Sequence, residues 1–292
     1  MNSKENGIKP VIKVYKTLFS TLKEHRQLIL PFIYFAYFEL AALIFIFIIP
    51  RDPFVRVFGP WVRTFWGEAF LHYPANFFLM PKLVSLSRMF LSIFIGSLVS
   101  GTVVLSVLEA IGNKRSYLKQ SFKSASKNYI SLFFIVFVIT LSFYFLTKLL
   151  TIGLIKYFAG GHTKLLFIGT RAWLGPILSI ISFLIALFIQ SGFAYAIPFL
   201  LIEKKKIIPS VISSFKLFKK KFFATLLLVG LPMVIYGPVI VLNYNTKFLV
   251  FNVFPEFILL VSLLGIAIAT LLIDPLVTIG TTILFLSDKD KK

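Results

Sequence analysis

Six long apolar segments, separated by short basic segments, limit most strongly what this chain can form. They cover approximately Leu28–Ile49, Phe90–Ile111, Tyr129–Leu154, Trp173–Ile202, Phe222–Val241 and Phe257–Phe285. A helix of about 20 apolar residues crosses a hydrocarbon core of about 30 Å, so each segment is long enough to span a membrane. The sequence therefore predicts an all-α integral membrane protein with six transmembrane helices in a single domain over residues 1–292.

The distribution of basic residues predicts the orientation of these spans. Of the 31 Lys and Arg residues, 21 lie in the terminal segments and in the two loops on the same side, and eight lie in the opposite three loops. By the positive-inside rule, both termini are then in the cytoplasm and the protein is a multi-pass protein of the inner (cytoplasmic) membrane. Most of the basic residues then face anionic phospholipid headgroups. We therefore expect these headgroups, and not nucleic acid, to be the partner that accounts for the net charge of +20.

A short motif recurs along the chain. Residues 120–132 and 213–225 align without a gap, and the matched positions include Ser121 with Ser214, Phe122 with Phe215 and Lys123 with Lys216. A looser third copy places Phe19 on the same position. The spacing predicts three repeated helix hairpins, over about 8–112, 113–203 and 204–286.

Each predicted hairpin is preceded by an amphipathic stretch, at about 8–24, 115–128 and 207–221. In the first stretch, apolar residues such as Val11, Leu18 and Leu22 follow the spacing of one helical face, and lysines occupy the remainder. A helix of this kind lies in the membrane interface. We therefore expect three cytoplasmic interfacial helices, one at the start of each hairpin.

The longest external loop, over about residues 50–86, contains a further helical pattern. Trp61, Phe65 and Trp66 recur at helical spacing after Gly59-Pro60. Trp is enriched at membrane interfaces, so this segment is expected to form an outer interfacial helix. Two roles remain open for it, an aromatic membrane anchor and a surface that docks another membrane protein.

The repeated motif resembles the membrane domain of bacterial glycerophosphoryl diester phosphodiesterases and related six-helix membrane proteins of unknown function. In those proteins a cytoplasmic amphipathic helix with Ser-Phe/Trp-Lys precedes a span. The matching residues here are Pro198, Ser214, Phe215, Lys216 and Lys220 in one copy, and Ser121, Phe122, Lys123, Lys127 and Asn128 in the other. The soluble catalytic domain of the phosphodiesterases is absent, so the resemblance implies the fold and not the enzyme activity.

The chain lacks the usual signatures of catalysis. His25, His72 and His162 are far apart in sequence, and none is spaced from an acid or another His as metal ligands would be. The absence of cysteine excludes disulfides, thiolate metal sites and cysteine nucleophiles. We therefore expect no enzyme activity, no catalytic residue, no metal and no cofactor.

Acidic residues inside the spans are the candidate polar site. Glu39 lies near the middle of the first span, Asp274 lies in the sixth, and Glu109 lies near the cytoplasmic end of the second. An acid at mid-membrane costs about 2.5–3.5 kcal/mol on insertion scales, so such residues face the bundle and have a partner or a role. Asp274-Pro275 also has the composition of a helix start, which predicts a break in the sixth span.

Two functions remain open from the sequence. The first is a non-enzymatic envelope protein that binds lipid or another membrane protein. The alternative is a transporter or channel for a small solute or lipid. A polar cavity that reaches Glu39 or Asp274 would favour transport, and a closed apolar bundle with an exposed aromatic patch would favour an interaction module.

Overall fold

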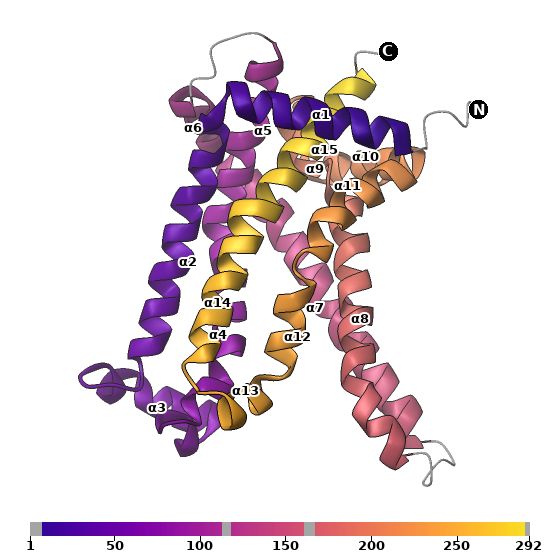
Figure 1. The fold of residues 1–292 in the computed structure, drawn as a ribbon. Coiled ribbons are helices and arrows are strands. Elements are labelled where there is room, and N and C mark those ends of the chain that lie inside the picture. The colour runs from indigo at the N-terminus through magenta and orange to yellow at the C-terminus, as the bar shows by residue number, and fades with distance from the viewer. Residues whose placement is uncertain (1–7, 113–117, 161–166, 290–292) are drawn as a thin grey trace.

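The computed structural model describes residues 8–112, 118–160 and 167–289, and within this part the chain is helical throughout, with 89% helix and no strands. Five of its helices are long and apolar enough to span a membrane, or six if the bent pair α11 and α12 counts as one span. The expected all-α membrane protein is confirmed at this level. Figure 1 shows the long helices side by side as a bundle.

The first half of the chain supplies two of the long helices. A short 3₁₀ turn, η2 (Arg26–Ile29), leads directly into α2 (Leu30–Ile48). Pro31 lies in the first turn of α2, where backbone N–H groups have no acceptor within the helix, so the missing N–H of proline costs no hydrogen bond. The second long helix consists of α4 (Asn76–Leu91), the π-helical segment η4 (Ser92–Gly96) and α5 (Ser97–Ile111).

The second half supplies the remaining long helices. α7 (Tyr129–Gly160) and α8 (Phe167–Phe193) form a hairpin, and α9 (Ala196–Leu201) follows α8 after a short turn. α11 (Phe222–Val234) and α12 (Gly237–Tyr244) are bent by 51° relative to one another. The last long helix consists of α14 (Phe257–Ile266), the π-helical segment η5 (Ala267–Ile273) and α15 (Asp274–Lys289).

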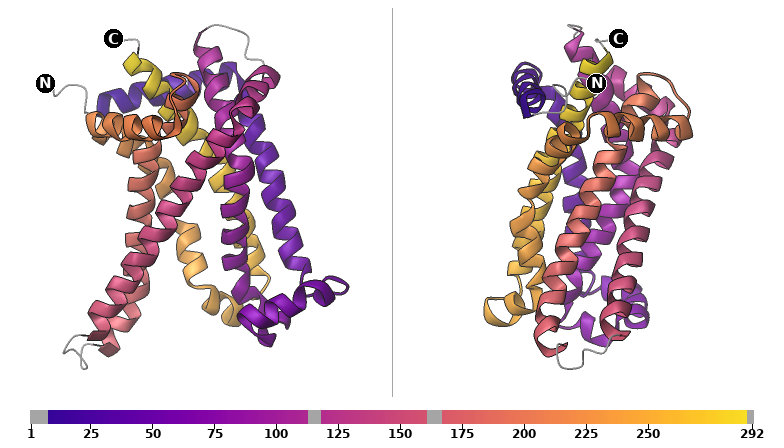
Figure 2. Two further views of the ribbon diagram at one scale, coloured as in Figure 1. Left: turned by 180° about the vertical axis from the view of Figure 1, so that it is seen from behind. Right: turned by 90° about the vertical axis from the view of Figure 1, so that its right-hand side faces the viewer.

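Short helices cover the two ends of the bundle. α1 (Ile8–Glu24), α6 (Leu118–Lys127) and α10 (Ile207–Lys220) lie at one end, which we call the α10 end. α3 (Phe54–Trp66), η3 (Glu68–Leu71) and α13 (Thr246–Asn252) lie at the other, the α3 end (Figures 1 and 2). The segment predicted at 115–128 thus has a helix over 118–127, and its residues 115–117 lie outside the described part.

The external loop predicted over 50–86 is too long. α4 begins at Asn76, so Lys82 and Arg88 belong to a continuous helix of 36 residues that ends at Ile111. Pro81 and Lys82 both lie inside this helix. A helix is present in this segment, although it begins before Gly59-Pro60, at Phe54.

Two apolar clusters hold the ends of the bundle together. At the α10 end, Leu18 of α1, Leu28 of η2, Val103 of α5 and Ile279 of α15 are fully buried in one cluster. At the α3 end, Leu43 and Ile258 belong to a second cluster with residues of α4, α12 and α13. The charged side chains described next come from α2, α4 and α15, each of which contributes residues to at least one of these clusters.

Candidate functional site

An arginine joins the two intramembrane acids into one cluster. Arg88 Nε of α4 lies 3.2 Å from Glu39 Oε1 of α2, and Arg88 Nη2 donates a hydrogen bond to Asp274 Oδ2 at 3.3 Å. The Glu39 side chain is 2% exposed, whereas Arg88 and Asp274 are 27% and 31% exposed. Both carboxyl groups therefore have a charged polar partner.

The π-helical segment η5 positions two members of this cluster. Thr270 lies within η5, is fully buried, and donates a hydrogen bond from Oγ1 to Glu39 Oε2. Asp274 follows η5 directly. A π-helical turn contains more residues than an α-helical turn, and one residue corresponds to about 100° of rotation about the helix axis. The π-helical segment therefore changes the direction in which the following side chains point. Thr270 and Asp274 therefore reach Glu39 and Arg88 from the same helix.

The predicted break at Asp274-Pro275 is wrong. Asp274 has helical dihedral angles, φ −59° and ψ −43°, and the helix continues from η5 into α15. Pro275 lies in the first turn of α15, where the missing N–H is accommodated by the altered hydrogen-bond pattern of the π segment that precedes it. The helix is therefore irregular at this point, because it changes from a π-helix to an α-helix, but it is not interrupted.

Glu109 is not part of the cluster. It lies near the end of α5, where its Oε2 accepts a hydrogen bond from Ser121 Oγ of α6 at 3.2 Å. This contact attaches α6 to the end of α5. The structure thus brings Glu39 and Asp274 together and leaves Glu109 with a separate local partner.

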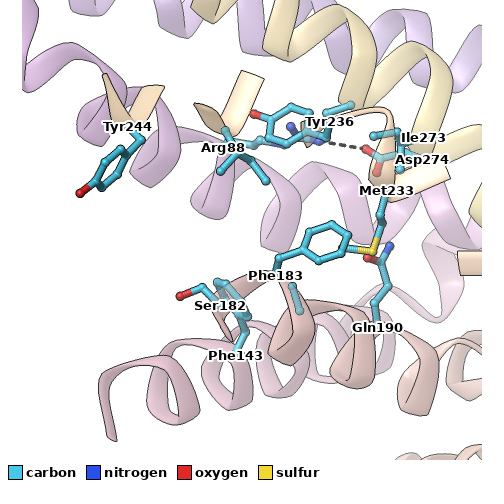
Figure 3. Close-up of a pocket in the computed structure, with 13 residues that line it drawn as sticks. Arg88, Phe143, Ser182, Phe183, Gln190, Met233, Tyr236, Tyr244, Ile273 and Asp274 are labelled. Carbon is cyan, nitrogen blue, oxygen red and sulfur yellow. Dashed lines mark hydrogen bonds and ion pairs between the residues drawn. The ribbon is translucent and has the colours of Figure 1, made fainter. Parts of the chain in front are cut away.

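A groove opens beside the cluster, between the α7–α8 hairpin and the bent pair α11–α12. Its volume is about 540 Å³. Arg88, Asp274 and Tyr236 line one wall, and Phe183 and Gln190 of α8 line the facing wall (Figure 3). Most of the remaining lining is apolar, and it includes Phe143, Met233 and Ile273.

Tyr236 lies where α11 and α12 bend apart. Its ring is beside Arg88 in Figure 3, and its hydroxyl is so close to α14 that a Cβ atom on Gly265 would approach it to 3.2 Å. Glycine at position 265 therefore leaves room for the tyrosine. Gly265 and Ala269 are small residues four positions apart on this face of the helix, and Ala269 lines the groove.

Arg88 is the site residue that the sequence analysis missed. The second apolar segment was expected to begin at Phe90, which leaves Arg88 just outside it. An arginine 12 residues after the start of a 36-residue apolar helix is itself a strong signal, since intramembrane charges mark partners or functional sites. Recognising that α4 extends to Asn76 would have identified Arg88.

The cluster has two carboxyl groups and one guanidinium group, so its charge is zero or negative unless both acids are protonated. Among the described residues, no group of three or more His, Cys, Asp or Glu side chains could hold a metal ion. The groove therefore offers hydrogen-bond donors and acceptors beside apolar surface.

Comparisons with protein-family models, curated proteins and solved structures gave no match to this chain.

Proposed function

We propose that the chain is a six-span inner-membrane protein with both termini in the cytoplasm. The excess of basic residues at the α10 end supports this orientation. In this arrangement α1, α6 and α10 lie along the inner membrane surface. Apolar side chains exposed on them support that placement, with Phe19 59%, Phe122 51% and Ile208 72% exposed.

The exposure pattern also supports the proposed three-unit repeat. At the matched positions, Phe19, Phe122 and Phe215 are all exposed, by 59%, 51% and 44%. The residue before each of them is buried, and these residues are Leu18, Ser121 and Ser214. The buried position attaches each helix to the bundle, and the exposed part of each phenylalanine ring is available to lipid.

We propose further that the protein is a non-enzymatic lipid-binding protein whose ligand occupies the groove beside Arg88. The observation that carries this proposal is the combination of an open apolar groove with a paired Arg88 and Asp274 on its wall. Ligand sites are typically mostly apolar with a few polar groups that fix orientation. An acyl chain fits the apolar lining, and a polar group of the same molecule fits the wall.

The charges of the wall favour an uncharged polar group on the ligand. Arg88 already has two carboxyl partners, Glu39 and Asp274, so an anionic headgroup would have to displace one of them. A hydroxyl or ester oxygen can instead accept from Gln190 or Arg88, and a hydroxyl can also donate to Asp274, without breaking the ion pairs. A diacylglycerol has this chemistry.

The test is lipid binding measured by native mass spectrometry of the purified protein with dioleoylglycerol. The variant Ala186→Phe adds a ring inside the groove and should weaken binding by about tenfold, because it occupies the volume that the acyl chain needs. Leu184→Phe, on an exposed position of the same helix, is the matched control and should leave binding unchanged. Equal binding by both variants and the wild type would exclude the groove.

Transport of such a lipid is the second candidate function. The bend of 51° between α11 and α12 favours it, because Tyr236 lies at this bend and lines the groove. Broken helices at a binding site are typical of transporters. A fluorescent diacylglycerol that crosses reconstituted vesicles faster with the wild type than with Ala186→Phe would support transport, and equal rates would leave binding as the function.

A further inference from the structure

A second cleft lies at the α10 end, away from the groove. Its volume is about 390 Å³, and it is formed by α9, α10, the segment between them and the end of α15. Phe199, Leu217 and Phe285 provide its apolar lining. The remaining lining is polar and mostly basic, which distinguishes this cleft from the groove beside Arg88.

The charges of this cleft are strongly unbalanced. Its lining includes four lysines, Lys205, Lys216, Lys220 and Lys289, but two acids, Glu203 and Asp288. Within residues 8–112, 118–160 and 167–289, Lys216 and Lys289 form no ion pair with an acid. The cleft therefore has an excess of positive charge.

Several contacts hold its polar groups in place. Lys205 Nζ lies 2.9 Å from Glu203 Oε2, donates a hydrogen bond to Ser213 Oγ at 3.1 Å, and lies 4.3 Å from the centroid of the Phe199 ring. These three partners fix the ammonium group of Lys205 at the cleft wall. Because this ammonium group is already held in one position, less conformational entropy is lost when it binds an anion.

Asp288 is held in a similar way. Its side chain is 11% exposed, and its Oδ1 lies 3.0 Å from Lys220 Nζ and 3.1 Å from Lys221 Nζ. Because two lysines share one carboxylate, Asp288 does not compensate the charge of Lys216 and Lys289. Those two amines remain available to an anion.

The neighbouring surface of α10 shows where this anion would come from. Ile208 and Ile212, on α10, are 72% and 50% exposed, as expected for a helix that contacts the acyl boundary of a membrane. Lysines at that depth attract anionic headgroups. We propose that the cleft is a specific site for the phosphate group of an anionic membrane lipid, beyond the general attraction of a basic surface.

The experiment is native mass spectrometry of the full chain in a neutral detergent, titrated with dioleoyl phosphatidic acid or dioleoyl phosphatidylcholine. The wild type should prefer phosphatidic acid. The variant K216Q/K289Q should bind phosphatidic acid about tenfold more weakly, because two uncompensated charges have been removed from the cleft. Its binding of dioleoylglycerol should be unchanged, which separates this site from the groove.

The matched control is K123Q/K127Q, which removes two exposed lysines from α6 at the same end of the bundle. It should lower phosphatidic acid binding by less than about twofold, because general attraction to a charged surface is spread over many lysines. An equal loss in both variants would overturn the specific site. Competition by glycerol 3-phosphate as strong as that of phosphatidic acid would also overturn it, because the ligand would then be a soluble phosphate ester.

Discussion

Arg88 donates a hydrogen bond to Asp274, although the two residues lie 186 positions apart in the chain. The same guanidinium lies 3.2 Å from Glu39, so one side chain connects α2, α4 and the last long helix. Removing one partner of a buried ion pair leaves a charge without compensation, which is costlier than removing the whole set. The contribution of these ion pairs can therefore be tested by measuring the stability of variants.

Arg88→Gln should destabilise the protein strongly. It leaves Glu39, whose side chain is 2% exposed, without its cation, and such a loss typically costs about 3–5 kcal/mol. Thermal unfolding in detergent micelles measures the effect. The triple variant R88Q/E39Q/D274N removes all three charges and should recover most of the lost stability. A triple variant no more stable than Arg88→Gln would contradict this account.

Asp274→Asn and Glu39→Gln should differ in ligand binding. Asp274 lines the groove, whereas Glu39 is buried behind Arg88 and is not part of the lining. Loss of one hydrogen bond to an ionised group costs about 1.5 kcal/mol, so Asp274→Asn should weaken dioleoylglycerol binding by about tenfold. Glu39→Gln should change it little. If Glu39→Gln weakens dioleoylglycerol binding more than Asp274→Asn does, the ligand does not bind beside Asp274.

The apolar helices that are long enough to span a membrane could be predicted from the sequence, because the length of an apolar segment is a local property. The position of Asn76 as a helix start could not, since Pro81 and Lys82 within α4 imitate a loop. The cluster was half predicted: Glu39 and Asp274 were identified as costly intramembrane acids, and Arg88 was not. Their pairing depends on how three helices pack, and on the π-helical segment η5, which no spacing rule indicated.

Small residues at helix contacts leave a clearer signal in the sequence. Ser97 and Gly101 are four residues apart, and both are buried in α5. A Cβ atom on Gly101 would lie 2.7 Å from Leu132 Cδ1 of α7. Here the sequence signal works because close approach of two helices requires a small residue on at least one of them.

Gly101→Ala should therefore destabilise the bundle. Leu132 is fully buried and has little freedom to move, so the added methyl group should cost about 1–3 kcal/mol through overpacking. Gly153→Ala is the control, because a Cβ atom there would meet nothing within 4 Å. That change should be neutral or should stabilise α7 by up to about 1 kcal/mol. The melting temperatures of the two variants check the contrast.

The orientation can be tested with single cysteines, since the chain contains none of its own. Asn128→Cys and Glu203→Cys should be protected in intact cells from a membrane-impermeant maleimide, because the positive-inside rule places them in the cytoplasm. Thr64→Cys on α3 should react. Labelling of either cytoplasmic cysteine in intact cells would overturn the six-span arrangement.

Spin labels test whether α6 and α10 lie in the membrane interface. Phe122 and Phe215 are 51% and 44% exposed, and on this arrangement their side chains contact the acyl boundary. Labels at both positions should show high accessibility to oxygen and low accessibility to a water-soluble nickel reagent. A label at Lys123, next to Phe122 on the exposed basic face, is the control and should show the opposite pattern. If Phe122 and Phe215 instead prove fully accessible to the nickel reagent, the two helices lie in water, and the exposed phenylalanines need another explanation.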